Sequence, residues 1–94
     1  MNDRKEGFDR RTNSAASERF GMVVVYVYAN RGRFDDLVFK VEMVRLYSSP
    51  AGIGETHNFE TLDLIDAIKS LYWARRWIAK TEKKLKRGSM WPRF

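Results

Sequence analysis

Residues 62–87 read LDLIDAIKSLYWARRWIAKTEKKLKR, the only long helical pattern in the chain and therefore the stretch that decides the fold. Apolar residues recur in it at spacings of three and four, as on one face of an α-helix. Thr61 is a suitable N-cap before this stretch, and Gly88 is a suitable terminator after it. The pattern predicts one C-terminal helix about 37 Å long.

The two sides of this helix differ in character. At about 100° per residue, one apolar stripe collects Leu64, Ile65, Ile68, Leu71, Tyr72, Ile78 and Ala79, and we expect it to pack on a sheet. Trp73 and Trp77 fall about 140° and 180° from Ile68, so they are predicted to lie on the outer face near Lys69 and Lys80. A second copy of the chain, a terminus, a partner protein or nucleic-acid bases are the alternatives for what covers them.

Two segments before the helix have strand character. Residues 20–29, FGMVVVYVYA, are rich in Val and Tyr, and residues 34–48, FDDLVFKVEMVRLYS, alternate so that Leu37, Phe39, Val41 and Met43 share one face. A turn at 30–33 joins them, a β-bulge is expected after Met43, and residues 55–59 form a possible third strand. We therefore expect the α+β class: an antiparallel β-hairpin or three-stranded meander packed on one long C-terminal α-helix.

The same patterns divide the chain into three parts. Residues 1–19 are polar and aperiodic and are predicted to be a flexible N-terminal arm, residues 20–88 a single α+β domain, and residues 89–94 a C-terminal tail. The longest apolar run, 22–29, is far shorter than the ~20 residues that cross a bilayer. With no cysteine and no secretory signal, we expect a cytoplasmic protein without a membrane partner.

Positive charge is concentrated at the C-terminal end. Residues 1–74 carry ten Lys or Arg and eleven Asp or Glu, whereas residues 75–94 carry eight Lys or Arg and one acidic residue, Glu82. Such asymmetry predicts an anionic partner, nucleic acid first and an acidic protein or nucleoprotein complex second. The predicted nucleic-acid contacts are Arg76, Lys80, Lys83, Lys84, Lys86 and Arg87.

Catalytic signals are weak. His57, with Glu55 and Glu60 nearby, is the one candidate for acid–base or metal chemistry, and a lone histidine beside a glycine-containing loop is more often a surface residue. No phosphate-binding glycine motif and no cysteine nucleophile occur in the sequence. We expect a non-enzymatic protein with no cofactor and no metal site.

The expected function is binding. In the first hypothesis the basic helix contacts nucleic acid, with phosphates neutralised by Lys and Arg and bases stacked on indole rings. In the alternative, the chain is a protein inhibitor or adaptor that uses the hairpin and the Trp73/Trp77 face; in size and composition it resembles accessory proteins of phages and mobile elements. Trp73, Trp77, Tyr26 and Tyr28 are the predicted partner or dimer contacts, and a homodimer is expected because residues 20–29 are apolar on both faces.

Overall fold

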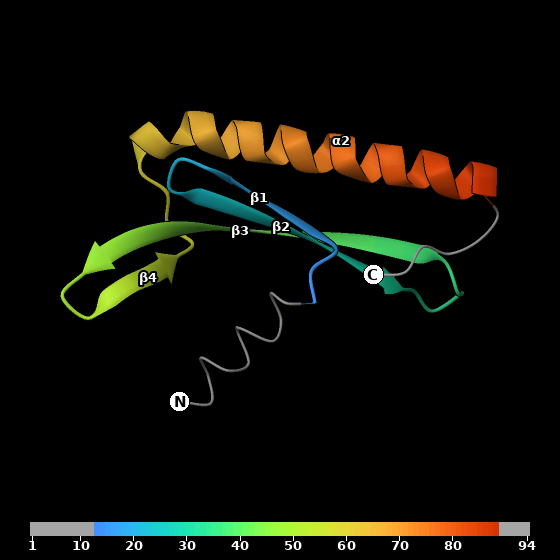
Figure 1. Ribbon diagram of the computed structural model, residues 1–94, viewed down its shortest axis with the longest axis horizontal. Coiled ribbons are helices and arrows are strands. Elements are labelled where there is room, and N and C mark those ends of the chain that lie inside the picture. The colour runs from blue at the N-terminus through green and yellow to red at the C-terminus, as the bar shows by residue number, and fades with distance from the viewer. Residues whose placement is uncertain (1–12, 89–94) are drawn as a thin grey trace.

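The computed structural model describes residues 13–88, with side chains described for residues 13–85. A four-stranded antiparallel sheet in the order β1-β2-β3-β4 carries one long helix on one face (Figure 1), which confirms the expected α+β class. The elements are β1 (Ala16–Phe20), β2 (Val23–Arg31), β3 (Leu37–Ser49), β4 (Gly52–Thr56), the 3₁₀ turn η1 (Thr61–Asp63) and α2 (Leu64–Gly88). Within the described chain, no helix has the length and apolar character needed to cross a membrane.

The first strand corrects the prediction of a flexible arm over residues 1–19. Residues 16–20 pair with β2, from Ala16 opposite Val27 to Phe20 opposite Val23. Gly21 makes the tight connection possible because its φ of 60° is one that a residue with a side chain rarely adopts. The one local signal for this hairpin was Gly21-Met22, a two-residue connection that begins with glycine, since the segment ASERF before it is mostly polar. Residues 1–12 of the predicted arm lie outside the described residues.

The central pair, β2 and β3, has a continuous register from Val23 opposite Arg45 to Arg31 opposite Leu37. The β-bulge predicted after Met43 is therefore wrong. The alternation of apolar and polar residues along β3 changes at this point because Val44 is also buried. Val44 is 1% exposed and lies opposite Val24, on the sheet face turned away from the helix. The third predicted strand, residues 55–59, exists but lies earlier, at Gly52–Thr56, where it pairs with the end of β3.

The helix packs on the sheet through a different face from the one predicted. Ala67, Ser70 and Ala74 are 7%, 0% and 2% exposed, and a row of fully buried valines, Val23, Val25 and Val27, forms the core on the sheet side. Small side chains let the helix axis come close to the valines, whereas a row of leucines would hold it away. The buried Ser70 hydroxyl donates a hydrogen bond to the carbonyl of Asp66 at 2.8 Å, so its burial leaves no unsatisfied donor.

Both tryptophans consequently face inward, which corrects their predicted place on the outer face. Trp73 and Trp77 are partly buried and pack against the cluster that contains Val25 and Ala74. The Trp77 ring meets Phe39 edge to face, with 6.1 Å between ring centroids and 84° between planes. The sheet face expected to meet the helix, which includes Phe39, is the one that does so. The error lay in the rotation of the helix about its own axis.

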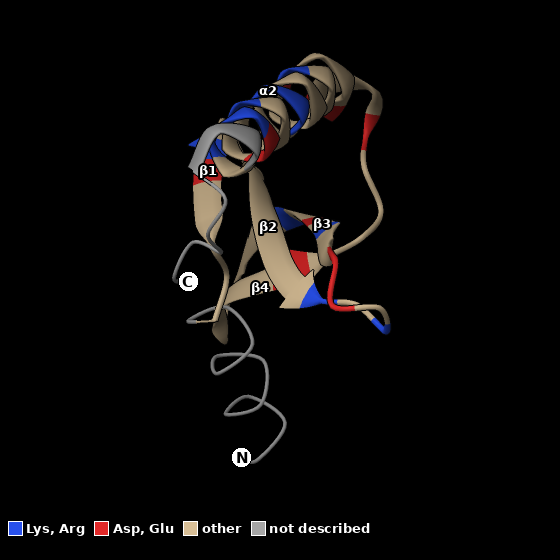
Figure 2. Ribbon diagram, turned by 90° about the vertical axis from the view of Figure 1, so that its right-hand side faces the viewer, with Lys and Arg blue, Asp and Glu red and all other residues tan. Residues whose placement is uncertain are grey.

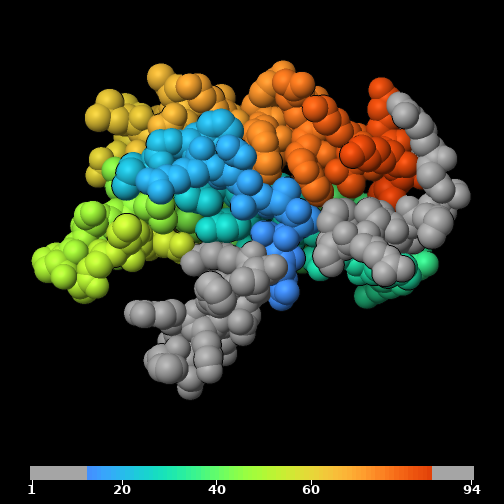
Figure 3. All heavy atoms as spheres, in the orientation of Figure 1, coloured from blue at the N-terminus to red at the C-terminus, as the bar shows by residue number. Residues whose placement is uncertain are grey.

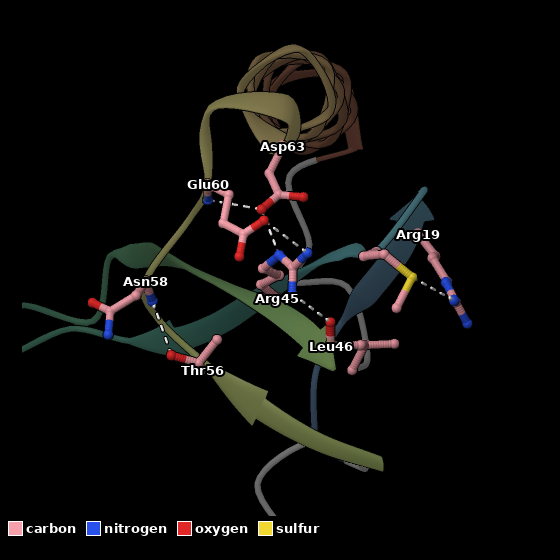
Figure 4. A network of polar contacts seen from close by, with 8 residues as sticks. Arg19, Arg45, Leu46, Thr56, Asn58, Glu60 and Asp63 are labelled. Atoms are coloured by element: carbon pink, nitrogen blue, oxygen red, sulfur yellow. Dashed lines mark hydrogen bonds and ion pairs between the residues drawn. The ribbon is translucent and has the colours of Figure 1, made fainter. Parts of the chain in front are cut away.

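The start of the helix is held by a polar network that includes β3 (Figure 4). Glu60, not Thr61, is the N-cap, and it forms a capping box with Asp63, whose carboxylate accepts a hydrogen bond from the Glu60 backbone N–H at 2.8 Å. Arg45 Nε also donates to Asp63, and Arg45 approaches Glu60 at 3.6 Å. Arg45 thus ties the first turn of the helix to the sheet.

This network predicts a pH-dependent stability. The backbone hydrogen bond from Glu60 and the neighbouring Arg45 hold the pKa of Asp63 below its ordinary value of 3.8, although burial opposes them. A carboxyl with a lowered pKa stabilises the folded state above that ordinary value, and this contribution disappears as the pH falls through the folded-state pKa. We expect Asp63→Asn to lower the melting temperature at pH 7 on the order of 5 °C.

Thermal melts of wild type and Asp63→Asn between pH 7 and pH 2.5 would measure this effect. The gap between the two should close as the pH falls below 3.8, the ordinary pKa of the carboxyl. Asp35→Asn is the matched control because the Asp35 side chain is 68% exposed in a surface ion pair with Arg31. A gap that stayed constant over the whole pH range would contradict the role assigned to the Asp63 carboxylate.

Candidate nucleic-acid interface

A groove of about 450 Å³ runs along the side of the helix that borders β1. Figure 3 shows this face, with β1 in blue lying along α2 in orange. Its lining combines four aromatic and three basic residues: Phe20, Tyr72, Trp73 and Trp77 with Lys69, Arg76 and Lys80. Among the described residues that line it, none is acidic. The groove therefore offers flat apolar surfaces beside positive charge.

The floor of the groove is made by side chains that also pack on the core. Phe20 ends β1 on the face toward the helix, because it pairs with the buried Val23. Trp73 and Trp77 lie one turn apart, so their rings follow each other along the axis at a rise of about 6 Å. Because the same rings touch the core, their orientation is set by packing, which limits the entropy lost when a ligand binds.

The rim of the groove is basic and solvent-exposed. Lys69, Arg76 and Lys80 are exposed and are distributed over about 16 Å of the helix axis. The Arg76 guanidinium lies over the Tyr72 ring, 5.7 Å from its centroid, which holds this cation at the groove edge. Figure 2 shows how Lys and Arg recur along α2.

The structure brings together four of the predicted site residues and leaves others apart. Trp73, Arg76, Trp77 and Lys80 line the one groove. Lys83 and Lys84 are exposed farther along the helix, where they extend the basic surface toward its C-terminal end. The side chains of Lys86 and Arg87, and the tail at 89–94, lie outside the described residues.

Tyr26 and Tyr28 lie on the opposite face of the sheet, away from the two tryptophans. Their ring centroids are 6.5 Å apart, and the Tyr28 hydroxyl donates a hydrogen bond to the Glu42 carboxylate at 2.8 Å. The acidic neighbour makes this face unfavourable for phosphate. A groove at Tyr28 is lined by one cation, Lys40, and one carboxylate, Glu42, whereas the groove at the tryptophans has three cations and no acidic residue among its described lining. The predicted contact residues therefore divide between two surfaces, and the tryptophan side has the larger excess of positive charge.

The residues considered for catalysis do not assemble. His57 is exposed and lies 3.7 Å from Glu42, while Glu60 is engaged with Arg45. Over residues 13–85 there is no group of three or more His, Cys, Asp or Glu side chains that could hold a metal ion.

Phe20, Lys69 and Tyr72 are the groove residues that the sequence prediction did not place in a site, although Lys69 was expected beside the tryptophans. Phe20 was assigned to the start of a strand, and Tyr72 to the stripe expected to be buried. Once Trp73 and Lys69 are placed on one side of the helix, the helical spacing alone places Arg76, Trp77 and Lys80 on the same side. Nothing local in the sequence adds Phe20, because its contact with the helix depends on β1 joining the sheet.

Comparisons with known protein families, with curated proteins and with solved structures found no match to this chain. The geometry of the groove is therefore the ground on which a function is proposed.

Proposed function

We propose that this protein binds single-stranded nucleic acid in the groove between α2 and β1, without enzymatic activity. The observation that carries the proposal is the lining of the groove, where Trp73 and Trp77 lie beside Lys69, Arg76 and Lys80. Sequence-tolerant binding of single strands combines a positively charged groove with aromatic rings on which bases stack. The cytoplasm, where we place the protein, contains such strands.

Single strands fit this groove better than a duplex. Bases in a duplex are already stacked on one another, so their faces are not available to indole rings. Bases of a single strand can leave the stack, and each base that stacks on an aromatic side chain contributes about 1–3 kcal/mol. The described elements include one long helix and no helix-turn-helix pair, the arrangement that commonly reads the major groove. A footprint of a few nucleotides matches the ~16 Å over which the three cations are distributed.

Binding by this groove is expected to depend strongly on salt. If Lys69, Arg76 and Lys80 each neutralise one phosphate, the affinity for a single strand should fall about 20-fold between 50 and 200 mM salt. Fluorescence anisotropy with a labelled ten-nucleotide oligo(dT) or oligo(U) measures this directly. In Arg76→Glu/Lys80→Glu the affinity at 50 mM salt should fall by at least about 10-fold and the salt slope should become shallower.

A second pair of charge reversals distinguishes the contribution of the groove cations to binding from the contribution of the net charge of the protein. Arg33→Glu/Lys40→Glu changes the charge equally, at exposed positions in the β2–β3 loop and on β3. This pair should leave the affinity within about threefold of wild type at 200 mM salt, where distant charges are screened. Equal losses in both pairs would indicate unspecific electrostatic attraction, and no binding at 50 mM salt would overturn the proposed function.

The stacking part of the proposal needs its own variant, Trp73→Leu, which keeps an apolar side chain against the core but removes the indole ring. Its affinity for the oligonucleotide should fall, since stacking is lost, while its affinity for polyglutamate should not change. If Trp73→Leu lowered the affinity for the oligonucleotide and for polyglutamate equally, the groove would be an anion site without base stacking.

The alternative of an inhibitor or adaptor has less support at the tryptophans. Trp73 and Trp77 are partly buried against the sheet, so less of each ring is accessible to a protein partner than an outward-facing pair would offer. Binding of an acidic protein would depend on salt as nucleic-acid binding does, but it would not depend on Trp73.

A further inference from the structure

The side of α2 that was predicted to be buried is exposed. Leu64, Ile65, Ile68, Leu71 and Tyr72, here called the outer stripe, are 49%, 67%, 66%, 49% and 57% exposed. Together they leave roughly 600 Å² accessible, which is at the upper limit of the apolar patches found on soluble monomers. Figure 2 shows the sheet on one side of α2 and no other described element on its outer side.

We propose that a second copy of this chain covers the outer stripe, with the two α2 helices antiparallel about a two-fold axis at Ile68. The stripe is symmetric about this residue, since its members stand four before, three before, three after and four after it. In an antiparallel pair, Leu64 of one copy meets Tyr72 of the other, Ile65 meets Leu71, and Ile68 meets itself. Such self-complementarity is what a two-fold interface requires.

The charges that flank the stripe favour the antiparallel arrangement. Arg75 and Arg76 are exposed beyond its C-terminal end, and Glu60, whose side chain is 72% exposed, precedes its N-terminal end. Antiparallel pairing about Ile68 brings Glu60 of each copy to the level of these arginines in the other copy, where Arg75, which does not line the groove, is available to pair with it. Parallel pairing would place Arg75 against Arg75, and like charges in contact are unfavourable.

The area is also sufficient. If each copy buries roughly 600 Å², the interface totals about 1,200 Å², the lower limit of specific, stable protein interfaces. Such an interface suits a dimer that dissociates at low protein concentration. The dimer differs from the one expected from the sequence, because it uses the outer stripe instead of Trp73, Trp77 and the tyrosines of β2.

The dimer has a consequence for the groove, which rests on the proposed function. The groove adjoins one side of the outer stripe and shares Tyr72 with it. A two-fold axis perpendicular to antiparallel helices keeps both grooves on the same face of the dimer. The Lys80 residues of the two copies would lie about 36 Å apart along the helix direction. One strand could therefore reach both grooves, which would raise its apparent affinity.

Sedimentation velocity of the full chain without nucleic acid, from 1 to 200 µM, tests the dimer independently of the groove. Wild type should dimerise in this range, and Ile68→Lys, which places two charges together at the axis, should raise the dissociation constant at least 10-fold. Ile53→Lys is the matched control, since Ile53 is 75% exposed on β4. A monomer at every concentration, or equal effects of both substitutions, would overturn the proposal.

Cysteine crosslinking tests the direction of the helices, because the chain contains no cysteine of its own. Under mild oxidation, Ile68→Cys should form a covalent dimer, since the two positions meet at the axis. Leu64→Cys should not, because the two positions would be about 12 Å apart along the helices. Equal crosslinking of both variants would indicate parallel helices and overturn the proposed geometry. A dimer that binds no oligonucleotide would refute only the proposed function, and a monomer that binds one would refute only the dimer.

Discussion

Replacing Trp77 with alanine is expected to lower the free energy of unfolding by about 2–4 kcal/mol, or about 10–20 °C in melting temperature. The indole ring packs on the core that contains Val25 and Ala74, and it meets the Phe39 ring edge to face at 6.1 Å. Its removal would leave a hollow between α2 and β3 that the neighbouring side chains cannot fill. The loss is below that of a fully buried tryptophan because Trp77 is only partly buried.

Urea unfolding of Trp77→Ala followed by circular dichroism would measure this loss, with Leu62→Ala as the control. Leu62 is 89% exposed in η1, so its truncation should change the free energy of unfolding by less than about 0.5 kcal/mol. If Trp77→Ala were as mild as Leu62→Ala, the tryptophan would face outward and the helix orientation described above would be wrong.

Enlarging Ala74 is the second substitution with a large expected effect. Ala74 is 2% exposed and packs in one cluster with Val25 and Val27 of β2, so the side chain of Ala74→Leu would collide with these valines. Overpacking of this kind costs about 1–3 kcal/mol, because the helix must move away from the sheet or the side chains must leave their preferred rotamers. We expect a melting temperature lower by about 5–15 °C.

The same substitution at Ala79 provides the control for Ala74→Leu, since Ala79 lies in the same helix and is exposed. Ala79→Leu should leave the melting temperature nearly unchanged, because the new side chain extends into solvent and leucine is a good helix former. Melts at low micromolar concentration keep any association between copies from masking the difference. If Ala79→Leu proved the more damaging substitution, the outer side of α2 would be the buried one.

Much of the candidate site could be predicted from the sequence, because its cations and indole rings belong to one helix. Spacing within a helix places Lys69, Trp73, Arg76, Trp77 and Lys80 on one side whatever the helix packs against. Phe20 could not be predicted, because it enters the groove only when β1 pairs with β2. The segment ASERF that forms β1 is short and mostly polar, so its strand conformation depends on hydrogen bonds to a partner strand rather than on its own pattern.

The sequence by itself determined the α+β class, the β2–β3 hairpin, the extent of the helix and its basic end, since alternation, helical period and charge are local properties. Only the tertiary structure decided which face of α2 meets the sheet. The helix has two surfaces without charged side chains at their centre, an exposed one of large aliphatic residues and a buried one of Ala67, Ser70 and Ala74 flanked by tryptophans. Counting apolar residues favours the first surface. Close approach to the valines of β2 selects the second, because a row of small side chains lets helix and sheet touch while the indole rings fill the space beside it.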